Sequence, residues 1–143
     1  MDNKDYTVNE VWDAPWQFRH NAKIGPEYHD REESILSQYD VFHEEKREFM
    51  EAMWKWQRAI DGVNDDTYDV MANPKVRADV AEEMADVMVT VSLLADMMGI
   101  SWLDAYMAKM EYNMHKSFEK DENGKVTDDS DVEKPDFTQF VGE

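Results

Sequence analysis

Four acidic residues of this sequence stand in two pairs, and the members of each pair are three residues apart. Glu45 and Glu48 form the first pair, and Glu83 and Asp86 form the second. Residues three apart share a face of an α-helix, so each pair would present two carboxylates side by side. Carboxylates brought together repel one another and must take up protons or bind a cation. Because the chain has no cysteine, an all-oxygen site would suit Mg²⁺ or Mn²⁺ better than zinc.

Each acidic pair belongs to a segment with a helical apolar pattern. Apolar residues recur at helical spacings from Ile35 to Ile60, and again from Val76 to Met98. We predict one helix over residues 32–61 and a second from Pro74 to about residue 98, which Gly99 ends. A third helix is predicted from Trp102 to about residues 118–120. The fold class is therefore all-α, and the central helical domain spans residues 32–120.

The side of each helix on which the acids lie determines whether they can meet. Glu45 and Glu83 both lie about 60° from the middle of their apolar stripes, and Glu48 and Asp86 lie further round on the same side. Two antiparallel helices packed through such stripes are related by an approximate two-fold axis. Residues displaced the same way then emerge on one side of the seam, so we expect the four carboxylates to converge. Glu44 lies nearly opposite the stripe.

The two ends of the chain lack long helical patterns of apolar residues. Residues 1–31 contain Pro15 and Gly25 and are predicted to form an irregular arm, which lies on the core or on a partner because exposed tryptophans are costly. Residues 121–143 are predicted to form an acidic tail with a turn at Asn123-Gly124. This tail is expected to be mobile or to dock through Phe137 and Phe140.

Charge and composition limit the function classes. The 143-residue chain carries a net charge of −18, which disfavours direct contact with nucleic-acid phosphates. No apolar run approaches the roughly 20 residues that span a bilayer, and the acidic first residues do not look like a signal peptide. We therefore expect a cytoplasmic protein that binds neither membranes nor nucleic acid. No Gly-rich GxxxxGK[ST] loop is present, so a P-loop mechanism is excluded.

The two acidic segments resemble the motifs of a known family. Residues 44–48 read EEKRE and residues 83–86 read EMAD, which are similar to the EExxE and ExxD motifs of the all-α, MazG-like nucleoside triphosphate pyrophosphohydrolases, related to dimeric dUTPases and dCTP pyrophosphatases. The resemblance covers about residues 35–118. It implies a helical bundle completed by oligomerisation, as a homodimer or homotetramer. It also implies Mg²⁺-dependent hydrolysis of a ribo- or deoxynucleoside triphosphate to the monophosphate and pyrophosphate, for sanitation or remodelling of the nucleotide pool.

The resemblance also implies roles for particular acids. Glu45, Glu48, Glu83 and Asp86 would bind Mg²⁺, with Mn²⁺ as an alternative ion. Glu44 could be a ligand, an acceptor beside the ligands or the group that orients the attacking water, so Glu44 and Glu45 are the candidate catalytic residues.

Further residues of the same resemblance would contact the nucleotide. The family holds phosphates with basic and Asn residues on its third helix, and Lys109, Asn113 and Lys116 share one helical face here. Trp54 and Trp56 are candidates for stacking on the base. Nothing in the sequence selects among the bases.

A non-enzymatic interpretation stays open beside this one. A helical protein with this charge could mimic nucleic acid in the groove of a basic partner, or act as a regulatory binding module. Mimicry requires acids spread along a face, whereas the paired acids beside an apolar seam are not needed for it.

Overall fold

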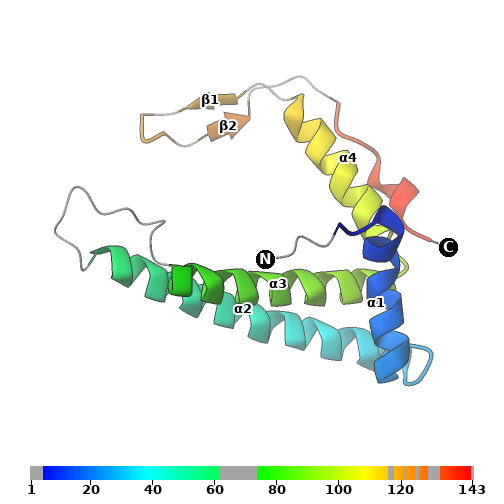
Figure 1. Cartoon of the computed structure of the whole chain (residues 1–143). Helices are drawn as coiled ribbons and strands as arrows, with labels where there is room; N and C mark the ends of the chain where they lie inside the picture. The colour runs from blue at the N-terminus through cyan, green and yellow to red at the C-terminus, as the bar shows by residue number, and fades with distance from the viewer. Residues whose placement is uncertain are drawn as a thin grey trace. The chain divides into compact units, whose positions relative to one another are not determined.

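The computed structural model describes residues 5–61, 74–115, 118–120, 122–124, 126–128 and 133–142. It confirms the all-α fold (Figure 1). In chain order the elements are α1 (Val8–Ala22), α2 (Arg31–Asp61), α3 (Pro74–Met97), α4 (Trp102–Met114), the short strands β1 (Phe118–Lys120) and β2 (Val126–Asp128), and the 3₁₀ helix η2 (Phe137–Phe140). The chain forms two compact units, Met1–Met97 and Met98–Glu143.

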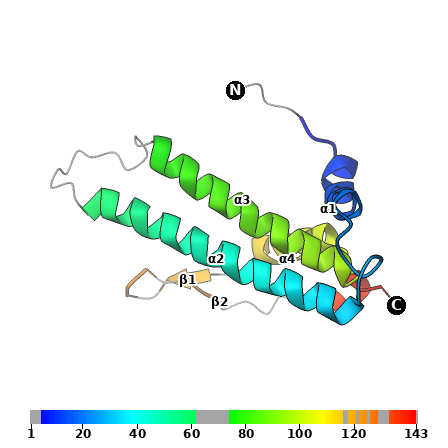
Figure 2. The ribbon, with the colours of Figure 1, turned by 90° about the horizontal axis from the view of Figure 1, so that it is seen from below.

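The first unit is built on the antiparallel pair of α2 and α3 (Figure 2). Both helices begin and end within one residue of their predicted bounds. Asp30 caps the start of α2, where its Oδ1 accepts a hydrogen bond from the Glu33 N–H at 3.1 Å, and Pro74 occupies the first position of α3. Among the described residues this pair supplies the buried apolar side chains Ala52, Leu93, Ala95 and Met97, and α1 adds Pro15.

The prediction of an irregular N-terminal arm is wrong for residues 8–22, which form α1. Thr7 and Glu10 make a capping box: Thr7 Oγ1 accepts from the Glu10 N–H at 3.2 Å, and Glu10 Oε2 accepts from the Thr7 N–H at 2.8 Å. The helix tolerates Pro15 at the loss of one backbone hydrogen bond. It packs on α3, across the end of the pair where α2 begins. The arm therefore lies on the core, as expected, but this contact does not bury its tryptophans, because Trp12 and Trp16 stay exposed.

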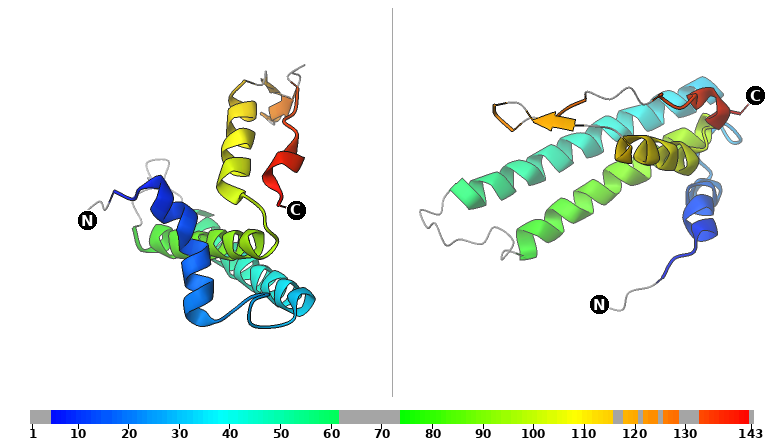
Figure 3. Two further views of the ribbon diagram at one scale, coloured as in Figure 1. Left: turned by 90° about the vertical axis from the view of Figure 1, so that its right-hand side faces the viewer. Right: turned by 90° about the horizontal axis from the view of Figure 1, so that it is seen from above.

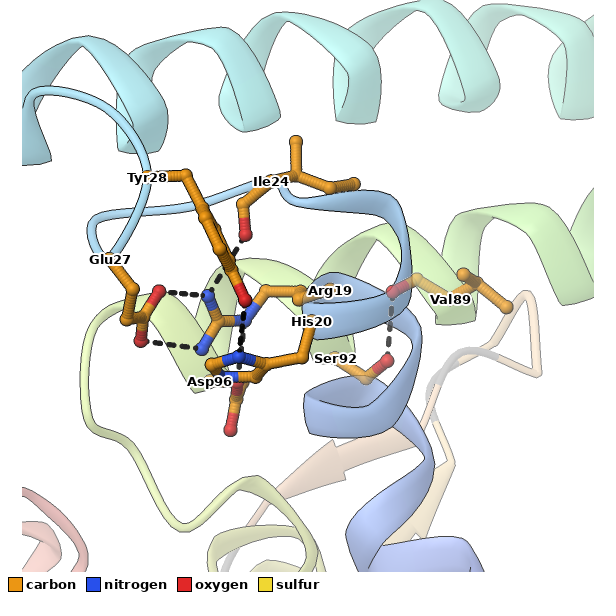
Figure 4. Close-up of polar contacts among 8 residues, drawn as sticks. All are labelled: Arg19, His20, Ile24, Glu27, Tyr28, Val89, Ser92 and Asp96. Carbon is orange, nitrogen blue, oxygen red and sulfur yellow. Dashed lines mark hydrogen bonds and ion pairs between the residues drawn. The ribbon is translucent and has the colours of Figure 1, made fainter.

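A buried arginine fixes α1 to the rest of the unit (Figure 4). The Arg19 side chain is 2% exposed, and its Nε donates to Asp96 Oδ2 of α3 at 2.6 Å. Its two terminal nitrogens donate to the Glu27 carboxylate at 2.7 and 3.1 Å. Gly25 allows this approach, because a Cβ there would collide with the guanidinium and its φ of +114° is unfavourable for other residues.

The second unit holds α4, the hairpin and the C-terminal segment. Helix α4 ends at Met114, short of the predicted residues 118–120. Residues 118–120 pair instead with residues 126–128 in antiparallel register, Phe118 opposite Asp128, around the predicted turn. A β-hairpin and a continuing helix compete for the same backbone groups, and here the hairpin prevails.

The C-terminal segment docks on the turn between Met97 and α4 through its backbone. The Ser101 N–H donates to Phe140 O at 2.8 Å, and the Gly142 N–H donates to Gly99 O at 2.9 Å. Phe137 and Phe140 contact each other edge to face with ring centroids 5.5 Å apart, and η2 lies beside α4 (Figure 3). Within the described ranges, no helix is long and apolar enough to cross a membrane.

Candidate metal centre

The antiparallel helices bring three of the predicted acids into one cluster. Glu45 of α2 and Glu83 and Asp86 of α3 each offer an oxygen within 4.8 Å of the others. Glu48 lies close enough for its charge to raise the pKa of both Glu45 and Glu83. Of the four carboxylates whose convergence the helical pattern predicts, three therefore meet in the structure and Glu48 lies near them.

The cluster is electrostatically unfavourable as it stands. Burial, followed by repulsion from Glu48, Asp86 and Glu83, raises the pKa of Glu45. Burial and then the charges of Glu48 and Asp86 raise the pKa of Glu83 in the same way. None of the ion pairs formed between described residues involves these acids. The neighbouring carboxylates therefore disfavour ionisation of Glu45 and Glu83.

The donor set fits a hard divalent cation. Glu83 Oε2 is enclosed by protein and has no hydrogen-bond partner among the described residues, although a buried carboxylate oxygen normally accepts at least one hydrogen bond. Carboxylate oxygens from two rigid helices, without sulfur or imidazole, are ligands typical of Mg²⁺ and Mn²⁺. A cation at the cluster would satisfy the enclosed oxygen and remove the repulsion together.

A cavity of about 540 Å³ extends from Glu45 and Asp86 along the two helices towards Gly25. Each of the two helices lines this cavity with four residues of one face, spaced four, three and four positions apart along the chain. From α2 these are Ser34, Gln38, Val41 and Glu45, and from α3 they are Asp86, Thr90, Leu93 and Met97. Helix α1 adds Phe18, and the loop after it adds Ile24 and His29. On the other side of the cluster a smaller hollow of about 330 Å³ is lined mainly by acids: Glu48, Glu51, Asp79, Glu82 and Glu83, with Lys55 and Ala52.

The other predicted site residues lie outside the cluster. Glu44 is exposed, and its charge is the weakest of the causes that raise the pKa of Glu45. Trp54 is exposed and Trp56 is half-buried, and neither lines the two cavities that border the acids.

The predicted phosphate-binding residues belong to the second unit. Lys109 and Asn113 lie on α4, where the Lys109 ammonium sits 4.8 Å from the centre of the Tyr112 ring. Lys116 lies outside the described residues.

Sequence reasoning missed the cavity residues next to the cluster. Ser34, Gln38 and Thr90 line the cavity and are all buried. Their signal is in the sequence, because Ser34 and Gln38 lie eleven and seven residues before Glu45 and Thr90 lies four after Asp86. These spacings put them on the same helical faces as the acids.

Comparison with protein-family models, curated proteins and solved structures gives no match for this chain. What the fold and the site define is an all-α protein with a carboxylate cluster between two antiparallel helices, next to a cavity of small-molecule size. The fold and the site do not by themselves define one particular activity.

Proposed function

We propose that the chain hydrolyses a ribo- or deoxynucleoside triphosphate to the monophosphate and pyrophosphate in a Mg²⁺-dependent reaction, as a MazG-like pyrophosphohydrolase. The observation that carries the proposal is the meeting of Glu45, Glu83 and Asp86 within 4.8 Å, next to Glu48 and without an ion pair to any base among the described residues. Those four acids match the EExxE and ExxD motifs on which the family resemblance rests.

The acids would act by holding the ion and the water. Glu45, Glu48, Glu83 and Asp86 would bind Mg²⁺ or Mn²⁺, which when bound supplies charge neutralisation for the triphosphate and lowers the pKa of water. Without a cation the cluster would repel a triphosphate. Of the two candidate catalytic acids, Glu45 lies within the cluster, where it would accept the proton of the attacking water. Water adds to phosphorus as the bond between the α- and β-phosphoryl groups breaks.

The remaining parts of the proposal concern the substrate and the assembly. Lys109, Asn113 and Lys116 would hold the phosphates. A nucleotide substrate also implies a cytoplasmic location. We propose a homodimer or homotetramer, which is supported by large apolar side chains that the chain leaves exposed, since monomers rarely expose extensive apolar patches. These include Trp16, Leu36, Trp54 and Met88.

Product analysis tests the reaction directly. The protein is incubated with a panel of ribo- and deoxynucleoside triphosphates and Mg²⁺ or Mn²⁺, and monophosphate with pyrophosphate is the expected product pair. Asp86→Asn should reduce turnover by more than the roughly 10–100-fold that loss of a group merely neighbouring a metal costs. Asp40→Asn is the matched control, because Asp40 is exposed on α2 and lines neither cavity.

Two results would contradict the proposal. Release of orthophosphate in place of pyrophosphate would show that a different bond is cleaved. No turnover of any nucleotide by folded protein would favour a non-enzymatic role for the acids.

A further inference from the structure

The cavity next to the acidic cluster combines apolar walls with buried polar side chains. Val41, Val89, Leu93 and Met97 supply much of its surface, and exposed Phe18 contributes an aromatic ring from α1. Its volume of about 540 Å³ falls within the range of roughly 300–1,000 Å³ that is usual for small-molecule sites. Flat heterocycles bind well between walls of this kind.

Gln38 presents a hydrogen-bond acceptor in this cavity. The residue is 6% exposed, and its Nε2 donates to the main-chain oxygen of Thr90 at 3.3 Å. A carbonyl oxygen can only accept, so this contact fixes which end of the amide faces Thr90. Gln38 Oε1 is left without a hydrogen bond among the described residues and can accept one from an N–H group.

Ser34 presents a second polar atom one helical turn away. The residue is 9% exposed and lines the same cavity. Its Oγ is enclosed and has no hydrogen-bond partner within the part of the chain that the structure describes. Since buried hydroxyl groups are normally paired, a ligand in the cavity would supply the missing partner.

From these contacts we infer that the cavity binds the base of the nucleotide, with Gln38 Oε1 and Ser34 Oγ on the polar edge of the base. The inference rests on the proposed function for the location of the phosphates. Gln38 lies seven residues from Glu45, or about 10 Å along the helix axis, and Ser34 lies about 16 Å away. With the triphosphate at the acids, the sugar spans the first interval and the base reaches the two polar side chains. The acceptor on Gln38 selects a base with an N–H group on that edge.

Substitution at the two polar positions tests the assignment. Gln38→Leu and Ser34→Ala are compared with two controls outside the cavity: Gln57→Leu, at an exposed position of α2, and Ser92→Ala, at a buried position of α3. Nucleoside binding without phosphate or metal is measured by NMR titration, and KM and kcat are measured for the nucleotide panel and for inorganic triphosphate.

The expected result is a change specific to the base. Gln38→Leu should weaken nucleoside binding and raise KM by roughly 2–12-fold, the range for one hydrogen bond between neutral groups, and should reduce the preference among bases. Hydrolysis of inorganic triphosphate, which has no base, should be unchanged in both cavity variants. Ser34→Ala removes no hydrogen bond between residues that the structure describes, so it keeps the inference testable even if Gln38→Leu fails to fold.

The outcomes separate this inference from the proposed function. If nucleotides are hydrolysed and both cavity variants keep the wild-type KM and base preference, the base assignment is overturned while the proposed function stands. If no nucleotide is hydrolysed but nucleosides bind and Gln38→Leu weakens that binding, the cavity is a nucleoside site and the proposed function fails. If folded wild-type protein binds neither nucleosides nor nucleotides, the inference is overturned.

Discussion

Arg19→Met should destabilise the first unit and release α1 from α3. The substitution removes a side chain that is 2% exposed and donates four hydrogen bonds: one to Asp96, two to Glu27 and one to Ile24 O at 3.2 Å. Methionine keeps most of the volume of the side chain, so the loss is of charge and hydrogen bonds more than of packing. The two carboxylates would then lack their cation.

The size of the loss in free energy of unfolding depends on how well the carboxylates of Asp96 and Glu27 are hydrated once Arg19 is gone. Removing one partner of a fully buried ion pair costs about 3–5 kcal/mol. The side chains of Asp96 and Glu27 are 26% and 44% exposed, so part of this cost is recovered by hydration. We expect the free energy of unfolding to fall by about 2–3 kcal/mol, or roughly 6–12 °C in Tm for a chain of this length.

Urea unfolding and hydrogen exchange measure this effect. Amides of α1 should exchange faster in Arg19→Met than those in the middle of α3. Arg47→Met is the matched control, since its ion pair with Glu51 is exposed, and it should cost less than about 0.5 kcal/mol. If Arg19→Met costs no more than Arg47→Met, or if a double-mutant cycle with Asp96→Asn shows no coupling, the ion group does not hold α1.

Four further changes test other parts of the structure. In metal-free protein Glu83→Gln should raise Tm at neutral pH, because it removes a carboxylate whose raised pKa shows that its charge destabilises the folded state. Mg²⁺ at 100 times its Kd should stabilise the wild-type protein by about 2.7 kcal/mol and the Glu83→Gln variant much less. Hydrogen bonds from Arg19 lower the pKa of Glu27 from 4.5 to about 2. The contribution of Glu27 to stability is therefore complete above pH 4.5 and is lost as the pH falls towards 2. Acid unfolding of the wild-type protein and of Glu27→Gln would measure this loss. Gly25→Ala should cost at least about 1–3 kcal/mol in thermal unfolding, the range for a strained backbone alone, because the new Cβ also meets Arg19. Lys109→Ala should raise KM for the nucleotide and leave Mn²⁺ affinity unchanged.

Each of these expectations has a result that would contradict it. A lower Tm for metal-free Glu83→Gln would mean that the carboxylate is stabilised by a partner and not repelled. Equal acid unfolding of Glu27→Gln and wild type would remove Glu27 from the ion group. An unchanged Tm for Gly25→Ala would mean that the loop relaxes without cost, and weaker Mn²⁺ binding by Lys109→Ala would refute its phosphate role.

The sequence predicted the parts of the fold that depend on long periodic segments. Helices α2 and α3 have 31 and 24 residues, and over such lengths the apolar stripe fixes both the helix and its buried face. The convergence of Glu45 with Glu83 and Asp86 follows from the same periodicity, because two stripes facing each other leave the acids on one side.

The secondary structure of short segments was harder to predict from the sequence, because local signals for helix, turn and strand conflict there. Pro15 and Gly25 suggested a loop, whereas the Thr7-to-Glu10 capping box, which is visible in the sequence, marks the start of α1. After α4, residues 118–120 pair with residues 126–128 across the turn at Asn123-Gly124, so they form a strand and do not continue the helix. Which signal prevails depends on contacts beyond the local sequence.

The cavity required knowledge of how α2 and α3 are aligned lengthwise. A helical pattern gives the face of Ser34 and Gln38 but not the residues opposite them. Whether Gln38 meets Thr90 O, and whether the Ser34 hydroxyl group finds a partner, depends on that alignment. Only the structure supplies it.

The shared helical faces of the acids and the cavity have a consequence for how such a protein can diverge. Inserting or deleting one residue between Gln38 and Glu45 would rotate the cavity side chains of α2 by about 100° relative to Glu45. The proposed base site and the proposed metal site would then no longer share a helical face. Exchanging side chains at Ser34, Gln38 or Leu93 leaves the carboxylates where they are. If the cavity binds the base as inferred, descendants of this chain can acquire new base preferences by point substitution, while the length of the intervening helix is held constant.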